Sequence, residues 1–192
     1  MKHAASREVF NYWNYRRGDR AAPERGDIDP VAIRRSLSDT FILAYEPETR
    51  HPFRLAGTRI CALLGRELKG ESFAALWDEA DRARIDELVA IVAEESTGMI
   101  AAVTGTAEDG QKVDLEMLLL PLTHRIERRG RMIGVLAPLA TPYWIGTMPI
   151  VALALGPVRH VGGEADTVAP RLVTGERNAL GRAFVVHQGG RQ

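Results

Sequence analysis

The side chains best suited to chemistry in this sequence are one cysteine and five histidines, and they are scattered along the chain. Cys61 has no second cysteine to pair with, which excludes an intrachain disulfide and a site built from several thiolates. The histidines are His3, His51, His124, His160 and His187. No two of them have the i, i+4 spacing that presents two metal ligands on one helix face. The sequence therefore predicts no metal site.

Two carboxylates have the spacing of an acid/base pair. Asp114 and Glu116 are two residues apart in a predicted strand and so share a face. Nothing nearby supplies a nucleophile or an oriented base, so we interpret both as solvent-facing strand positions. The sequence also has no Gly-rich phosphate loop and no serine in a nucleophile-elbow context. We expect a protein that is not an enzyme.

Residues 16–30 form a polar loop rich in arginine. Guanidinium groups suit phosphate, so the loop could bind a nucleotide or a phosphorylated partner. Acidic residues are interleaved with these arginines and can pair with them locally. The favoured interpretation is therefore a structural loop.

Composition excludes several broad classes of protein. The 192 residues correspond to one domain with tails. The 25 basic residues are matched by 25 acidic ones, which argues against a nucleic-acid binder. Residues 1–17 lack the apolar stretch of a secretory signal, and the single cysteine fits a reducing compartment, so we expect a cytoplasmic protein.

One uncharged run is long enough to span a bilayer. It covers residues 132–158, which is 27 residues without a charge. Prolines and glycines interrupt it throughout, and a spanning helix needs nearly unbroken backbone pairing. Two buried strands explain the run better, so we expect no membrane segment.

The first half of the chain predicts helices around a short hairpin. A helix is expected over 6–17, ending at Gly18, and a second from the Asp29–Pro30 start to about residue 37. Two short strands are expected over 40–45 and 53–56, with a turn between them. A short helix then ends at Gly65, and a longer helix follows over about 82–96.

The second half predicts a three-stranded meander. Its strands cover 100–106, 112–124 and 132–139, and residues 149–155 form an edge strand or cross the sheet. Both faces of the middle strand are apolar toward its end: Val113, Leu115, Met117 and Leu119 point one way, and Leu118, Leu120 and Leu122 the other. Such a strand needs cover on its second face, from the N-terminal helix with Phe10 and Trp13 or from another subunit.

This order of elements resembles the PAS fold. The segment FRLAGTRICALLGRELKGESFAALW, residues 53–77, resembles the PAS pattern of a strand, a short helix and two glycine turns, here at Gly65 and Gly70. With the opening YWNYRRGDRAAPERGDIDP and the strand LEMLLLPL, the chain resembles the stand-alone PAS proteins common in alphaproteobacteria. The resemblance implies an α+β fold with a PAS-like antiparallel five-stranded sheet, helices on one face and an N-terminal helical extension.

The same resemblance sets the expected domain organisation. Residues 1–38 are the helical extension, 39–160 the PAS domain and 161–192 a disordered tail. The resemblance also bears on cofactors. Photosensory PAS domains carry a reactive cysteine after the second glycine turn, where this chain has Ser72, so no covalent flavin adduct is expected. Haem-binding PAS domains place a histidine on the long helix, which has none here, so no haem is expected. No cofactor is predicted.

PAS domains serve as sensors, dimerisation modules and adaptors on one scaffold. We predict a signalling protein without its own output domain that forms a homodimer or docks onto a sensor histidine kinase or another PAS protein. The candidate interface residues are Phe10, Trp13, Leu118, Leu120, Leu122 and Trp144. The alternative is a sensor that holds a small-molecule ligand inside the domain. Its candidate lining residues are Cys61, Leu64, Leu76, Ile85, Leu88, Val89, Leu115 and Met117, all equally explained as core.

Overall fold

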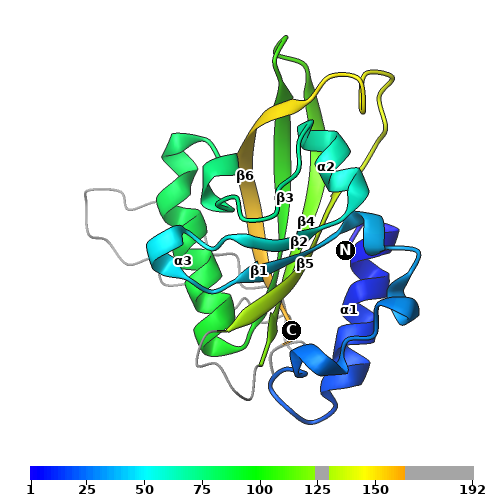
Figure 1. The fold of residues 1–192 in the computed structure, drawn as a ribbon, viewed down its shortest axis with the longest axis vertical. Coiled ribbons are helices and arrows are strands. Elements are labelled where there is room, and N and C mark those ends of the chain that lie inside the picture. Colours follow the sequence, from blue (N-terminus) through cyan, green and yellow to red (C-terminus); the bar gives the residue numbers. More distant parts are fainter. Residues whose placement is uncertain (124–129, 163–192) are drawn as a thin grey trace, which may run out of the picture.

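The computed structural model describes residues 1–123 and 130–162 (Figure 1). Within them, one antiparallel sheet of six strands has the order β2-β1-β5-β4-β3-β6. The strands are β1 (Thr40–Ala44), β2 (Phe53–Ala56), β3 (Gly98–Ala107), β4 (Lys112–Leu122), β5 (Arg131–Pro138) and β6 (Ile150–Val161). The α-helices are α1 (Ala4–Arg17), α2 (Thr58–Leu64) and α3 (Glu79–Glu95). Short 3₁₀ helices are η1 (Arg25–Asp27), η2 (Pro30–Ile33), η3 (Leu37–Asp39), η4 (Pro47–Thr49) and η5 (Ala74–Leu76).

The meander of β3, β4 and β5 follows the period of two in the sequence. Val103 lies opposite Leu115 and Met117 opposite Leu136, so these strands bring their apolar residues onto the same face. The turn between β3 and β4 is closed at Gly110, whose φ of +84° is accessible to glycine at no steric cost. The alternation of β4 thus creates the two-sided apolar strand that the sequence predicted.

The sheet has six strands rather than the expected five, because β6 pairs with β3 along its length. The prediction of a possible edge strand over 149–155 captured only the first half of β6. Gly156 and Pro157 signal a break, but they lie in an irregularity of the ladder opposite Ala102. There the missing N–H of proline costs little, and Gly156 lets the chains approach closely, since a Cβ would come 3.0 Å from the Ala102 oxygen.

The helix expected over 29–37 was wrong in type. Asp29 caps its start as predicted, accepting a hydrogen bond from the Val31 amide at 2.9 Å. The segment then forms the separate 3₁₀ turns η2 and η3, each only a few residues long. α1 also begins earlier than expected, because the His3 ring accepts a hydrogen bond from the Ala5 amide and caps the first turn.

Helices cover both faces of the sheet (Figure 1), with α1 and α3 on opposite sides. α2, η5 and α3 pack on one face and form the larger core, which we call the inner core. α1 packs on the other face over β4 and β5 and forms the outer core. Trp13 is fully buried there, so the N-terminal helix provides the cover that β4 requires.

Of the helices in the described part of the chain, none is both long and apolar enough to cross a membrane. The uncharged run that suggested a span is instead divided between β5, a loop and β6. His124 and most of the predicted tail lie outside the described residues.

Candidate functional site

The predicted ligand-lining residues lie together in the inner core. Cys61 and Leu64 come from α2, Leu76 from η5, three residues from α3 and two from β4. The residues from the longer elements are Ile85, Leu88, Val89, Leu115 and Met117, all buried. The sequence therefore grouped them correctly as one cluster, and whether they line a ligand site stays a prediction.

Four aromatic side chains that the sequence analysis did not single out lie in the same core. The ring centroids of Phe41 and Phe53 are 5.6 Å apart, and Phe73 is 5.7 Å from each. Trp77 extends the group, with its ring 5.7 Å from Phe73. All four are almost completely buried, so they occupy space between the sheet and the helices that a ligand would otherwise fill.

The indole N–H of Trp77 is a polar group within this apolar core. Its Nε1 is buried and has no hydrogen-bond acceptor among the described residues. A buried N–H without a partner is costly, and a carbonyl, carboxylate or hydroxyl oxygen of a ligand would satisfy it. Trp77 therefore joins the residues that could hold a small molecule.

Cys61 is partly exposed rather than a wholly buried core residue. Its Sγ lies 3.8 Å from Glu67 Oε1 and 4.0 Å from the Ala56 carbonyl oxygen. Burial raises the pKa of the Cys61 thiol, and the nearby Glu67 carboxylate raises it further. The thiol is protonated near neutral pH and is a poor nucleophile.

Ser72 occupies the position where the resemblance implied a cysteine in photosensory domains. Its hydroxyl donates to the Arg50 carbonyl at 3.1 Å and accepts from the Ala75 amide at 3.3 Å. These bonds join the β1–β2 loop to the start of η5. The side chain is thus engaged in a structural role.

The predicted interface residues are buried within a single chain. Leu118, Leu120 and Leu122 lie under α1 together with Trp13, and only Phe10 of this group remains partly exposed. Within one chain α1 covers the three leucines, and Trp13 of α1 is itself buried against the sheet, so whether these residues form an interface stays a prediction. Trp144 is also buried, but it belongs to the inner core and not to the face under α1.

Glu116 was predicted to face solvent and is instead buried beneath the start of the chain. Its two carboxylate oxygens accept hydrogen bonds from the Lys2 amide at 2.6 Å and the His3 amide at 2.9 Å. Burial acts to raise the pKa of Glu116, but the hydrogen bonds from these two amides oppose it, and the pKa lies below its ordinary value. Asp114 is exposed, as predicted, so the two acids lie in different surroundings.

Two further bonds anchor α1. The Trp13 indole donates to the Pro121 carbonyl at 2.8 Å, and the Ser36 hydroxyl donates to the Glu8 carboxylate. Glu116 acts near the first turn and Trp13 near the last. The N-terminal helix is therefore held at both ends by specific polar contacts.

The arginine-rich loop pairs internally. Asp27 lies 2.8 Å from Arg20 and 3.9 Å from Arg16. The Glu24 backbone amide and the Arg20 guanidinium hold the pKa of Asp27 below its ordinary value. This pairing agrees with the interpretation of a structural loop.

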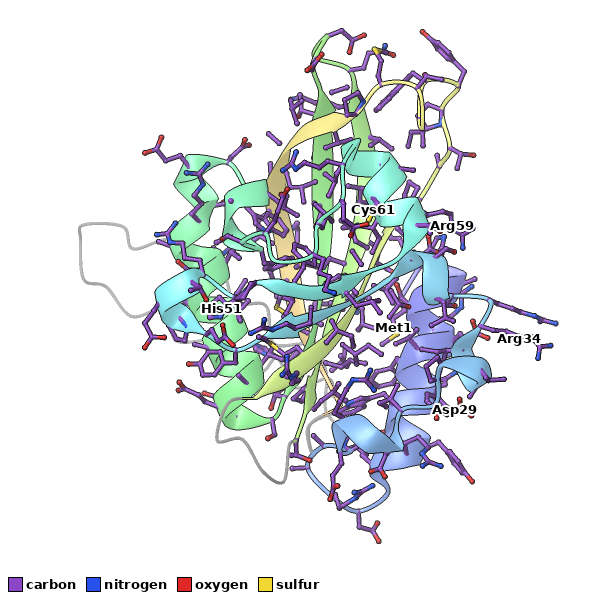
Figure 2. All side chains as sticks on the ribbon, in the orientation of Figure 1. Met1, Asp29, Arg34, His51, Arg59 and Cys61 are labelled. Atoms are coloured by element: carbon purple, nitrogen blue, oxygen red, sulfur yellow. The ribbon has the colours of Figure 1, made fainter. Side chains whose placement is uncertain are left out.

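His51, which sequence analysis placed in an ordinary turn, is buried in the structure. Its ring stacks on Tyr45 with centroids 5.4 Å apart and planes at 3°, and its Nε2 lies 3.8 Å from Asp86 Oδ1 on α3. Figure 2 shows His51 beside α3, well apart from Cys61. The hydrophobic period of the sequence could not predict this burial, because it depends on a contact with Asp86 of α3, which lies 35 residues further along the chain.

The remaining chemical features are few. Among residues 1–123 and 130–162, no group of three or more possible metal ligands comes together. A surface depression of about 430 Å³ lies at the ends of β4 and β5, lined by Lys112, Val113, Asp114, Leu139, Ala140, Thr141 and Pro142. None of the predicted ligand-lining residues borders this depression.

The comparison with family models identifies one family. The model of the PAS domain family matches residues 1–137. A search of curated proteins finds no match. Similar solved structures include the PAS domain of an HTR-like protein from Haloarcula marismortui, at 16% identity and a TM-score of 0.40, covering 54% of this chain and 84% of that one.

Two light-oxygen-voltage (LOV) structures are also similar. One is a LOV domain studied with a flavin analogue, at 14% identity and a TM-score of 0.45, covering 59% of this chain and 85% of that one. The other is the dark state of the blue-light photoreceptor Aureochrome1 LOV, at 12% identity and a TM-score of 0.43, covering 60% and 83%.

Proposed function

Because this chain belongs to the PAS domain family of sensory and signalling domains, we propose that it signals by docking onto another protein through the outer face of its sheet. The observation that carries the proposal is the covered apolar face of β4. The partner is a second copy of this chain, and a sensor histidine kinase or another PAS protein is the alternative. The proposal includes a cytoplasmic location and no catalytic role.

α1 is suited to be an exchangeable cover. Of its 14 residues only Ala5, Ser6, Val9 and Trp13 are buried, and two of these are small. Much of its attachment therefore depends on polar contacts at its ends, above all the carboxylate of Glu116. When α1 moves aside, Leu118 and Leu120 become available to an equivalent helix of a partner.

Sedimentation over a concentration series tests this function. We expect wild type to associate reversibly and Glu116→Gln, which weakens the attachment of α1, to dimerise at lower concentration. Asp114→Asn is the matched control, since it makes the same change on the same strand at an exposed position. A protein that stays monomeric in all three forms, with no partner retained, contradicts the proposal.

A small-molecule sensor is the second candidate, supported by the unpaired Trp77 Nε1 in the inner core. A ligand acceptor at this position would make the buried indole a recognition element. Native mass spectrometry and the absorption spectrum of the purified protein test the idea, with Trp77→Phe as the comparison. Two results would speak against this candidate: wild type that carries no bound molecule, or a Trp77→Phe variant that retains the molecule bound to wild type.

A further inference from the structure

The β1–β2 loop meets α3 at His51, whose buried imidazole has a ring nitrogen without a hydrogen-bond partner among the described residues. His51 is 1% exposed, and its Nε2 is 3.8 Å from Asp86 Oδ1, longer than a hydrogen bond. Within the described residues, neither His51 Nδ1 nor Asp86 Oδ1 has a hydrogen-bond partner. Buried polar atoms without partners are rare in native structures, so this pair requires an explanation.

The backbone that places His51 inside is also unfavourable. Arg50 and His51 have φ values of 52° and 59°, the left-handed region that side-chain-bearing residues seldom occupy. Hydrogen bonds hold the loop in this shape: the His51 amide donates to the Glu46 carbonyl at 3.0 Å, and the Phe73 amide donates to the His51 carbonyl at 3.3 Å. The loop is thus fastened in a strained conformation that keeps the imidazole buried.

Asp86 is the acid on α3 that faces the imidazole, and it is already shared. Its other oxygen lies 3.7 Å from the Arg50 guanidinium. The Tyr45 ring covers the imidazole, while the Tyr45 hydroxyl donates to Glu94, a bond that raises the pKa of Tyr45 to about 12. Tyr45 therefore stays neutral across the range in which histidine titrates.

Another acid of the loop, Glu46, is paired with a residue other than His51. The carboxylate of Glu46 lies 2.5 Å from the Arg54 guanidinium, on the strand that follows the loop. A protonated His51 would lose its hydration in this buried position. Among the described residues, only Asp86, which is 3.8 Å away and shared with Arg50, would compensate for that loss.

We propose that this contact is a proton-sensitive fastening between the β1–β2 loop and α3, which opens when His51 takes up a proton. Opening lets both ring N–H groups reach water and releases the left-handed residues. Burial lowers the pKa of His51, and the opposing effect of Asp86 is smaller, so a proton binds the open loop more readily than the closed one. The inference does not depend on the proposed docking function.

Hydrogen exchange of the His51 and Phe73 amides tests the proposal. With rates corrected for the intrinsic pH dependence of exchange, the opening of wild type should increase by up to about tenfold between about pH 7.5 and about pH 5.5. This bound follows if the open loop titrates with the ordinary histidine value and the closed loop takes up no proton.

Three variants separate the imidazole from other titrating groups. His51→Asn keeps a residue that tolerates positive φ but removes the titration, so its opening should not vary with pH. Asp86→Asn removes the opposing carboxylate and should give a rise at least as steep as in wild type. His160→Asn, at an exposed position on β6, should behave as wild type does.

Two results would overturn the proposal. One is wild type and His51→Asn with the same pH dependence. The other is a His51 imidazole that titrates at or above its ordinary value while the two reporter amides stay protected, as observed by NMR on wild type. The second measurement uses the unaltered protein, so it decides the matter even if a variant fails to fold.

Discussion

The ring of Phe41 on β1 lies against the backbone of Gly134 on β5, its direct partner in the sheet. A Cβ at position 134 would come within 2.7 Å of three ring carbons. Phe41 in turn contacts Phe53 and Phe73, so its position is fixed by the aromatic group of the inner core. The absence of a side chain at position 134 therefore makes room for a core aromatic.

Gly134→Ala should destabilise the protein by about 1–3 kcal/mol, because the added methyl group overpacks a buried site. Gly26→Ala is the control, since nothing lies within 4 Å of its Cβ position and its φ is not positive. Denaturant unfolding followed by circular dichroism measures both. Equal stability of Gly134→Ala and wild type would show that Phe41 can move aside without cost.

The element types followed largely from the sequence, and the exceptions have physical reasons. Period two identified β3, β4 and β5, since each strand has a continuous apolar inner face. Gly156 and Pro157 concealed the second half of β6, because the irregularity that tolerates them depends on the pairing with β3. The conformational preferences of single residues cannot predict a bulge that depends on the pairing of two strands.

The site was less predictable, because it depends on contacts between distant segments. Glu116 has the sequence context of a solvent-facing acid, and it is buried only because residues 2 and 3 fold back over it. The burial of His51 likewise depends on α3. By contrast, the residues of the inner core were grouped correctly, since helical and strand periods alone direct them to one side.

Glu116→Gln should lower stability at neutral pH by about 1–3 kcal/mol, because a buried charged acceptor of two amide bonds is replaced by a weaker one. The folded-state pKa of Glu116 lies below its unfolded value, so its stabilisation is present above that unfolded value and is lost as pH falls through the folded value. Urea titrations at neutral and acid pH should thus show wild type and variant converging in acid. Asp114→Asn should change stability by less than about 0.5 kcal/mol.

Arg59→Met should lower the stability of the folded protein, because it removes the cation beside a buried carboxylate. Asp39 is buried and lies 2.5 Å from Arg59, a residue of α2 (Figure 2). Burial raises the pKa of Asp39, and Arg59 opposes this effect, so removing the guanidinium raises the pKa further.

A raised carboxyl pKa penalises the folded state above the unfolded value, and acid relieves the penalty. The variant should therefore lose about 1–3 kcal/mol at neutral pH and less under acid conditions, as measured by urea titration. Arg66→Met, which breaks an exposed pair with Glu71, is the matched control and should cost less than about 1 kcal/mol. A loss for Arg59→Met that is the same at both pH values would point to lost packing instead of charge.

Ser96→Gly should stabilise the protein. Ser96 follows the last residue of α3 with φ 54° and ψ 30°, the left-handed conformation that glycine adopts without a Cβ penalty. The expected gain is about 0.5–1 kcal/mol, reduced by the extra freedom of glycine in the unfolded chain. Ala83→Gly is the contrasting control: it places glycine at an exposed position inside α3 and should lower the free energy of unfolding by about 1 kcal/mol. Thermal unfolding of both variants checks the pair, and a fall in melting temperature for Ser96→Gly would mean that the serine side chain supports the helix end.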